Sequence, residues 1–223
     1  MGLIPRLTKK GAASTFVGAA LLILASPVMA PQLLAFPYAV ETEIGTVHSE
    51  RALDPAMVQE SVETVKARMA TTPLASPDEN RPIFITDGGW RWHWLALRSS
   101  QSLAITRPLN TAVVVNKTDP ERGTIVSLGG ERTLGSVLAH EFTHGLIRRN
   151  FGILRSVTYP QWKVEGYCDY VAGESTLSDE QAAALERAGT DSPALPYYHG
   201  RRRVADILAA NGGSVDQLFN AED

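Results

Sequence analysis

Residues 133–150 form the strongest helical pattern in the chain, and this pattern contains two histidines. Its apolar positions recur three and four residues apart: Leu134, Val137, Leu138, Phe142, Leu146 and Ile147. His140 and His144 are four positions apart, so on a helix they project about 40° from each other and roughly 6 Å apart along the axis. Two imidazoles in this arrangement can bind one metal ion. The pattern therefore predicts a metal-binding helix.

Glu141 completes the motif His-Glu-x-x-His (HExxH) in residues 140–144. The spacing of the two histidines suits a tetrahedral zinc ion, Zn²⁺. Glu141 lies beside the same helix face, where its carboxylate can take a proton from a zinc-activated water without being a ligand. The alternative is two surface histidines next to a solvated glutamate. The motif gives His140 and His144 as candidate metal ligands and Glu141 as the candidate catalytic residue.

A catalytic zinc site needs three protein ligands and one open position, so HExxH alone is incomplete. Ile147 and Asn150 stand where a metzincin would continue with glycine and histidine, which excludes that class. The single cysteine, Cys168, excludes an internal disulfide and any site with two thiolates, and we expect it to act as a small buried apolar residue. Glu165, near the start of the next expected helix, is the candidate third ligand.

The segment Trp162–Gly166 reads W-x-x-E-G. Together with HExxH it resembles the gluzincins, the peptidase-MA-like zinc metallopeptidases, and the resemblance covers about residues 131–172. It implies that Glu165 is the third zinc ligand. It also implies that Asp169, four residues later, orients a ligand histidine by accepting its Nδ1–H. The alternative for Asp169 is an ordinary exposed carboxylate on a helix.

The resemblance implies hydrolysis of a peptide or protein substrate, with Glu141 as general base and then general acid. The developing oxyanion needs a hydrogen-bond donor. Gluzincins supply a Tyr or His from a later segment, which here is Tyr197, Tyr198 or His199, and the sequence does not choose among them. A competing function is an exported or membrane-tethered binding module that keeps the zincin scaffold without turnover. A third is hydrolysis of a non-peptide amide in the cell envelope.

The order of strand and helix patterns predicts the α+β class. Strand patterns cover residues 82–86, 103–106, 111–115 and 124–128, and helical patterns cover 54–70, 133–150, 160–172, a segment opened by a capping box at 178–181, and 196–210. We expect a small zincin-like (minigluzincin) domain: a short, mostly antiparallel sheet, then an active-site helix and a second, ligand-bearing helix. Gly166 would let these two helices approach closely beside the ligand. Trp90, Trp92 and Trp94 are expected to pack one face of their segment and decorate the other rather than line a substrate cleft.

A basic N-terminal cluster precedes residues 11–40, which carry no formal charge and are apolar at their centre. This pattern is typical of an export signal. We expect residues 1–40 to be a signal peptide cleaved after Ala30, or else a membrane anchor formed by residues 12–36. Either way, residues 41–223 are expected to form a single zinc metallopeptidase-like domain outside the cytoplasm, periplasmic or secreted. Membrane association would run through the N-terminal segment.

Composition limits the partners. With 44% hydrophobic and 20% charged residues the chain is an ordinary globular protein, and one compact domain is expected. The net charge is −3, and the only basic tract beyond the N-terminus is Arg201–Arg203. The electrostatic footprint of a nucleic-acid-binding protein is therefore missing, and we expect no nucleic acid partner.

Overall fold

The computed structural model of the chain describes residues 18, 29–99, 101–107, 111–127 and 130–221. These residues fall into two units, 1–35 and 36–223. In the first unit the described part includes the short 3₁₀ helix η1 (Pro31–Leu34). The centre of the expected export signal lies outside the described residues. Among the described residues, no helix combines the length and apolar character needed to cross a lipid bilayer.

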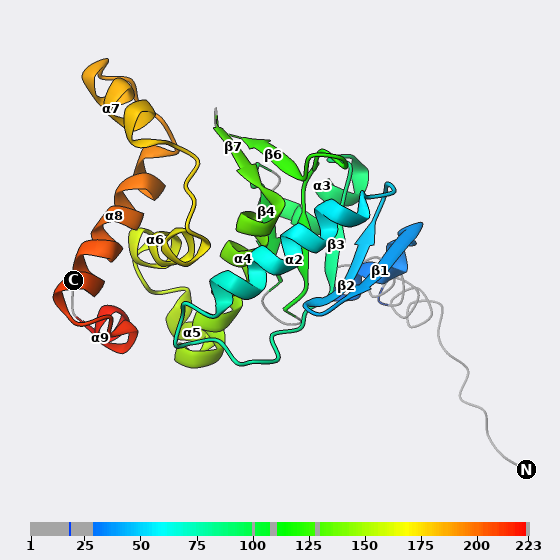
Figure 1. Cartoon of the computed structure of the whole chain (residues 1–223), viewed down its shortest axis with the longest axis horizontal. Helices are drawn as coiled ribbons and strands as arrows, with labels where there is room; N and C mark the ends of the chain where they lie inside the picture. The colour runs from blue at the N-terminus through cyan, green and yellow to red at the C-terminus, as the bar shows by residue number, and fades with distance from the viewer. Residues whose placement is uncertain (1–17, 19–28, 100, 108–110, 128–129, 222–223) are drawn as a thin grey trace, which may run out of the picture. The chain divides into compact units, whose positions relative to one another are not determined.

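The second unit contains a five-stranded sheet in the order β1-β2-β3-β5-β4 (Figure 1). The strands are β1 (Tyr38–Thr42), β2 (Gly45–Ser49), β3 (Ile83–Ile85), β4 (Ala104–Thr106) and β5 (Val113–Val115). Strands β2, β3 and β5 run parallel, and β1 and β4 are antiparallel strands at the two edges. The expectation of a mostly antiparallel sheet is therefore wrong. The reason is that helices lie between β2 and β3 and between β3 and the β4–β5 pair, and parallel pairing requires such crossover connections.

The helices of the second unit are α2 (Pro55–Met69), α3 (Trp90–Ala96), α4 (Leu134–Phe151), α5 (Ile153–Ser156), α6 (Gln161–Ala172), α7 (Asp179–Arg187), α8 (Leu195–Ala210) and α9 (Val215–Asn220). A 3₁₀ turn η2 (Leu97–Ser99) and a hairpin of β6 (Thr124–Ser127) with β7 (Gly130–Thr133) complete the described elements. The α+β class is confirmed. The helices expected at 54–70, 133–150, 160–172, 178 onward and 196–210 are present within a few residues, whereas β1, β2, β7, α3, α5 and α9 were not expected.

Side chains at the helix ends explain several of these boundaries. The carboxylate of Asp54 accepts hydrogen bonds from the first backbone N–H groups of α2, and the hydroxyl of Thr133 accepts one from Ser136 at the start of α4. The capping box of Ser178 and Gln181 is present at α7, as the sequence predicts. Polar caps thus mark the starts of α2, α4 and α7, and α4 is the helix that carries the two histidines of the motif.

The tryptophans of the 90–94 segment lie on helix α3, where one of them is buried and the other two are at the surface. Trp92 is buried, with 1% of its surface exposed, and packs in the interior. Trp90 and Trp94 remain 59% and 37% exposed. At helical spacing, alternate residues do not share one face, and a single tryptophan of the three therefore reaches the interior.

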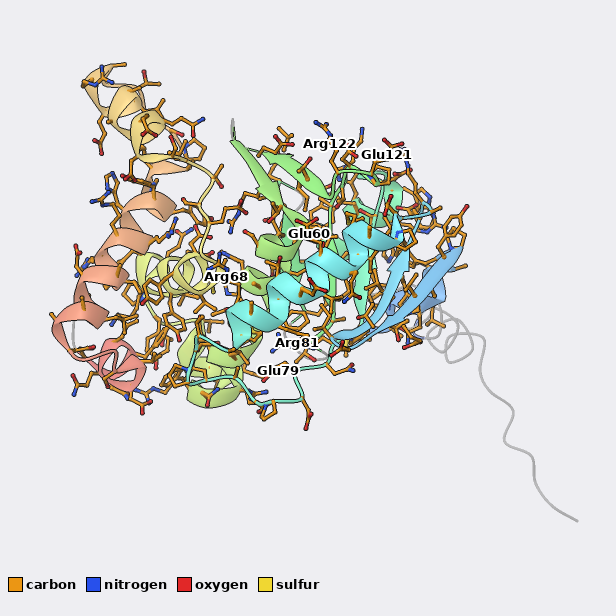
Figure 2. The ribbon with its side chains drawn as sticks, in the orientation of Figure 1. Glu60, Arg68, Glu79, Arg81, Glu121 and Arg122 are labelled. Atoms are coloured by element: carbon orange, nitrogen blue, oxygen red, sulfur yellow. The ribbon has the colours of Figure 1, made fainter. Side chains whose placement is uncertain are left out.

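Helix α4 lies at the centre of the second unit and contacts α2, α6 and the strands β4 and β5 (Figure 1). An ion network around the buried carboxylate of Glu79 joins α4 to the segment that precedes β3, where Figure 2 labels Glu79 and Arg81. Glu79 lies 3.2 Å from the Arg81 guanidinium and 2.5 Å from that of Arg149 on α4. Arg81 stacks over the ring of Phe142, with its Cζ 4.6 Å from the ring centre, and fills the space left by Gly145. Charged groups as well as apolar packing therefore hold α4 in place.

Candidate metal centre

Three predicted metal ligands meet where α4 packs against α6. The Oε2 atom of Glu165 lies 3.3 Å from Nε2 of His140 and 3.6 Å from Nε2 of His144. A tetrahedral zinc ion with ligands at about 2.05 Å holds its ligand atoms roughly 3.3 Å apart. The Glu165 carboxylate thus lies at the spacing of a fellow zinc ligand from each imidazole, and the chemistry of the set, two imidazoles and one carboxylate, suits zinc.

Glu165 is brought to this position by the first turns of α6. Burial alone would raise the pKa of its carboxyl, but the charge of His144 and the hydrogen bonds with both histidines outweigh this and hold the pKa far below its ordinary value. Glu165 therefore stays an ionised carboxylate, the form that binds a metal. The sequence predicts that its neighbour Gly166 lets α6 approach α4 closely. The structure places Gly166 against a different helix. A side-chain carbon there would lie 2.4 Å from the backbone of Gly200 on α8, so the close backbone approach is between α6 and α8.

Asp169 is buried, with 1% of its surface exposed, and is not the exposed helix carboxylate of the alternative hypothesis. Its Oδ1 lies 2.7 Å from Nδ1 of His140 and accepts a 2.8 Å hydrogen bond from Nη1 of Arg132. Burial by itself would lower the pKa of His140, but Asp169 and Glu165 raise it to about 10. Asp169 is thus positioned to fix the orientation of His140 and to leave its Nε2 facing His144 and Glu165.

Glu141 lies beside the three donor atoms and makes a different contact. Its Oε2 is 2.8 Å from the hydroxyl of Thr106, the last residue of the edge strand β4, and that hydroxyl is also 2.6 Å from the backbone carbonyl of Glu141. The side chain is buried. Glu141 is thus held by β4 instead of joining the His–His–Glu cluster, which fits a base and not a ligand.

A cleft of about 690 Å³ opens onto these residues. Its lining includes the whole of β4, and the metal-centre residues His140, Glu141, His144 and Glu165. The backbone of Leu103 accepts a hydrogen bond from Asn116, and the N–H of Arg107 donates to Ala112. In an antiparallel pair the backbone N–H and C=O groups of successive residues point alternately toward and away from the partner strand, so those of Ala104 point away from β5, on the outer side of the edge strand.

The three candidate oxyanion donors lie in different surroundings. Tyr197 lines the cleft, and Gln161 donates a 3.3 Å hydrogen bond to its hydroxyl. The hydroxyl of Tyr198 instead lies 2.8 Å from Asp179 on α7. The ring of His199 is exposed and lies 3.1 Å from Glu186. Of the three, Tyr197 is therefore the residue that can meet a molecule in the cleft.

Cys168 offers a second set of donor atoms. The ligand atoms of His140, His144 and Cys168 lie within 4.8 Å of one another. Burial raises the pKa of this thiol well above its ordinary value, and the carboxylates of Glu165 and Glu141 raise it further. A thiol must lose its proton to bind zinc, so its surroundings oppose the step that ligation requires. Glu165 lies 3.3 and 3.6 Å from the two imidazoles, and its lowered pKa keeps it ionised.

Three residues of the site were not predicted from the sequence: Arg132, Thr106 and Arg148. Each joins segments that lie 35 to 42 positions apart along the chain. No motif marks these residues, so only the tertiary structure identifies them. Among known proteins, no family model, no curated protein and no solved structure matches the chain.

Proposed function

We propose that this chain is a zinc-dependent metallopeptidase of the gluzincin type. The observation that carries the proposal is the meeting of Nε2 of His140, Nε2 of His144 and Oε2 of Glu165, 3.3 and 3.6 Å apart, on the wall of a cleft. Zinc bound by these three ligands supplies a Lewis acid and lowers the pKa of a coordinated water toward ~7. The remaining chemistry belongs to side chains of the protein.

Glu141 acts as the base in this proposal. It takes a proton from the attacking water and returns it to the departing amine, and its hydrogen bond with Thr106 keeps the carboxylate beside the reacting atoms. Tyr197 donates a hydrogen bond to the oxyanion that forms on the substrate carbonyl. The two groups come from α4 and α8, so both helices contribute to the reaction.

The edge strand β4 supports a peptide as the substrate. It lines the cleft next to Glu141, and the N–H and C=O of Ala104 point away from β5. An extended peptide can add to such an edge through main-chain hydrogen bonds, and this places a backbone carbonyl of the peptide beside the zinc ligands. A non-peptide amide would not use these backbone groups.

The competing proposal is a binding module that keeps the metal without turnover. Such a module needs His140, His144 and Glu165, but it has no use for Glu141 or for the contact from Thr106. The presence of a held carboxylate at position 141 favours the enzyme.

The decisive experiment compares the full chain with its Glu141→Gln and Glu165→Ala variants. We expect roughly one zinc per chain in the wild type and in Glu141→Gln, with hydrolysis of a mixed peptide library by the wild type alone. Zinc content is measured by elemental analysis and cleavage by mass spectrometry. Equal cleavage by Glu141→Gln would remove the mechanism, and full zinc affinity in Glu165→Ala would remove the third ligand.

We also propose that the protein acts outside the cytoplasm. The support is the basic N-terminal cluster followed by the uncharged stretch of residues 11–40. Fractionation of cells that produce the chain, with N-terminal sequencing of the product, tests both export and cleavage after Ala30. A product found with the soluble cytoplasmic proteins and carrying residue 1 would contradict this.

A further inference from the structure

Two arginines gather at one end of the cleft, where β4 ends. Arg107 follows directly after β4, and Arg148 lies one helical turn after His144 on α4. Both side chains line the cleft. The Nη1 atom of Arg148 donates a 2.9 Å hydrogen bond to the backbone carbonyl of Thr106, and Nη1 of Arg107 donates a 2.6 Å bond to that of Leu95.

Arg148 is close to the reacting groups. Thr106 binds Arg148 through its carbonyl and Glu141 through its hydroxyl, so a single residue of β4 separates the guanidinium from the base. In an extended peptide each residue advances by about 3.3 Å. A group one or two residues from the scissile bond of a peptide lying along β4 therefore comes within reach of Arg148.

The cleft is lined by a third arginine, Arg132, which has a counter-charge that Arg148 lacks among the described residues. Arg132 donates to the carboxylate of Asp169 at 2.8 Å. Arg148 donates to a neutral carbonyl, and within the described part of the chain no carboxylate lies at ion-pair distance from it. Burial lowers the pKa of Arg148, and the negative charges of Glu141 and Glu165, which make no ion pair with it, act in the opposite direction.

A partly buried guanidinium that contacts only a neutral carbonyl is a poor arrangement for stability, because its loss of hydration is not offset by a counter-charge. A ligand carboxylate would provide that counter-charge. The planar guanidinium donates two parallel hydrogen bonds to a carboxylate, and such charge-assisted bonds are the strong ones. The Arg107 guanidinium at the same end adds a second positive charge.

We infer that the cleft end formed by Arg107 and Arg148 binds a carboxylate of the substrate peptide, close to the bond that is cut. This inference rests on the proposed peptidase function and adds a substrate class to it. The carboxylate is either the C-terminus of the peptide or the side chain of an aspartate or glutamate. In the first case the enzyme removes residues from a C-terminus, and in the second it cuts inside chains beside acidic residues.

The test uses matched peptides that differ only in this charge. One pair of libraries carries a free or an amidated C-terminus, and another carries glutamate or glutamine near the cleavage site. For the zinc-loaded full chain we expect kcat/KM to be about 10- to 100-fold higher for the carboxylate form in one of the two pairs. The pair that shows the preference identifies the source of the carboxylate.

Arg148→Gln keeps an N–H that can bond to the Thr106 carbonyl but removes the charge. We expect the preference to fall to within about twofold of unity in this variant and to be largely restored in Arg148→Lys. Arg187→Gln, on the exposed surface of α7, removes the same charge elsewhere and is expected to keep the wild-type preference. The ratio between paired peptides is insensitive to a general loss of folded enzyme, so a merely structural role of Arg148 would leave it unchanged.

Three results would overturn the inference: no preference in either pair for the wild type, a preference that survives Arg148→Gln, or a preference that is lost equally in Arg187→Gln. If the wild type cleaves no peptide, the proposed function fails. Equilibrium binding of the same peptide pairs to the zinc-loaded wild type and to Arg148→Gln then tests carboxylate recognition by itself, with the same ratios as the criterion.

Discussion

The Nδ1 atom of His140 lies 2.7 Å from Oδ1 of Asp169, which is carried by the neighbouring helix α6. An ionised carboxylate only accepts hydrogen bonds, so the proton of this pair lies on Nδ1. The other ring nitrogen, Nε2, is then the one directed at Glu165, 3.3 Å away. This hydrogen bond therefore holds the ring in the orientation in which Nε2 can bind zinc once Nε2 has lost its proton.

Asp169→Asn should weaken zinc binding by about 10- to 100-fold, because an amide holds the imidazole less firmly than a carboxylate does. Zinc affinity is measured by competition with a chelator of known affinity. Asp206→Asn, which removes an exposed carboxylate on α8, is the matched control and should bind zinc as the wild type does. Unchanged affinity in Asp169→Asn would mean that the hydrogen bond has no role in the metal site.

Cys168→Ala should keep one zinc per chain and the wild-type rate of hydrolysis. The thiol is buried and its pKa is raised, so it is expected to be a packing residue and not a ligand. Elemental analysis of the purified variant gives the stoichiometry, with Glu165→Ala as the comparison that should lose the metal. The reverse pattern, zinc lost with Cys168 and retained without Glu165, would make the metal centre His–His–Cys.

Thr106→Val removes the hydroxyl beside Glu141 while keeping the shape of the side chain. We expect kcat to fall about tenfold with little change in KM, because the base is no longer held by a hydrogen bond. Thr106→Ser keeps the hydroxyl and should restore most of kcat. A valine variant with the kinetics of the wild type would show that Thr106 does not position Glu141.

Much of the fold was predictable because its helices carry local signals. Apolar spacing located α2 and α4, Pro160 marked the start of α6, and the Ser178 capping box located the start of α7. Strand β1 was missed because four of its five residues are exposed, so it shows no alternation of apolar and polar residues. The parallel pairing of β2 with β3 depends on a crossover through α2, and no local pattern reports such a contact.

Some residues of the candidate site were also predictable from local patterns, and others were not. HExxH and W-x-x-E-G are short patterns, so His140, His144 and Glu165 could be named before their geometry was known. Thr106 and Arg148 could not, because each acts through a partner brought near by tertiary packing. The order of residues along a chain indicates which side chains share a helix face, but not which strand edge comes to lie beside that face.

The Glu79 network predicts a pH-dependent stability. Burial by itself would raise the pKa of Glu79, but the hydrogen bond from Arg149, that from the N–H of Ser76 and the charge of Arg81 lower it below its ordinary value of 4.5. A carboxyl whose pKa is lowered by folding stabilises the protein above the unfolded pKa, and this contribution is lost as the pH falls through the folded pKa.

Glu79→Gln should therefore lower the free energy of unfolding by about 3 kcal/mol near neutral pH, since it leaves Arg81 buried without its counter-charge. The difference from the wild type should shrink as the pH is lowered below the unfolded pKa of about 4.5 and through the lowered pKa of the folded state. Urea unfolding at several pH values measures it. Glu60→Gln, on the exposed face of α2 (Figure 2), should show little effect at any pH. A difference that does not depend on pH would argue against an ionised Glu79.

Gly166 connects the packing of α6 and α8 to the metal centre. A side-chain carbon at this position would lie 2.4 Å from the backbone of Gly200, and backbone atoms cannot move aside as a flexible side chain can. Gly166→Ala should force the two helices apart and destabilise the protein by about 1–3 kcal/mol. Because α6 carries Glu165 and α8 carries Tyr197, the same displacement should also weaken zinc binding and lower kcat.

The comparison for this variant is Gly89→Ala, since a side-chain carbon at Gly89 meets no atom within 4 Å. We expect that variant to keep its zinc affinity and to lose little stability. Urea unfolding and chelator competition on both proteins separate the two effects. If Gly166→Ala is destabilised but binds zinc with unchanged affinity, α8 can shift without moving Glu165, and the metal centre then depends on the contact between α4 and α6 alone.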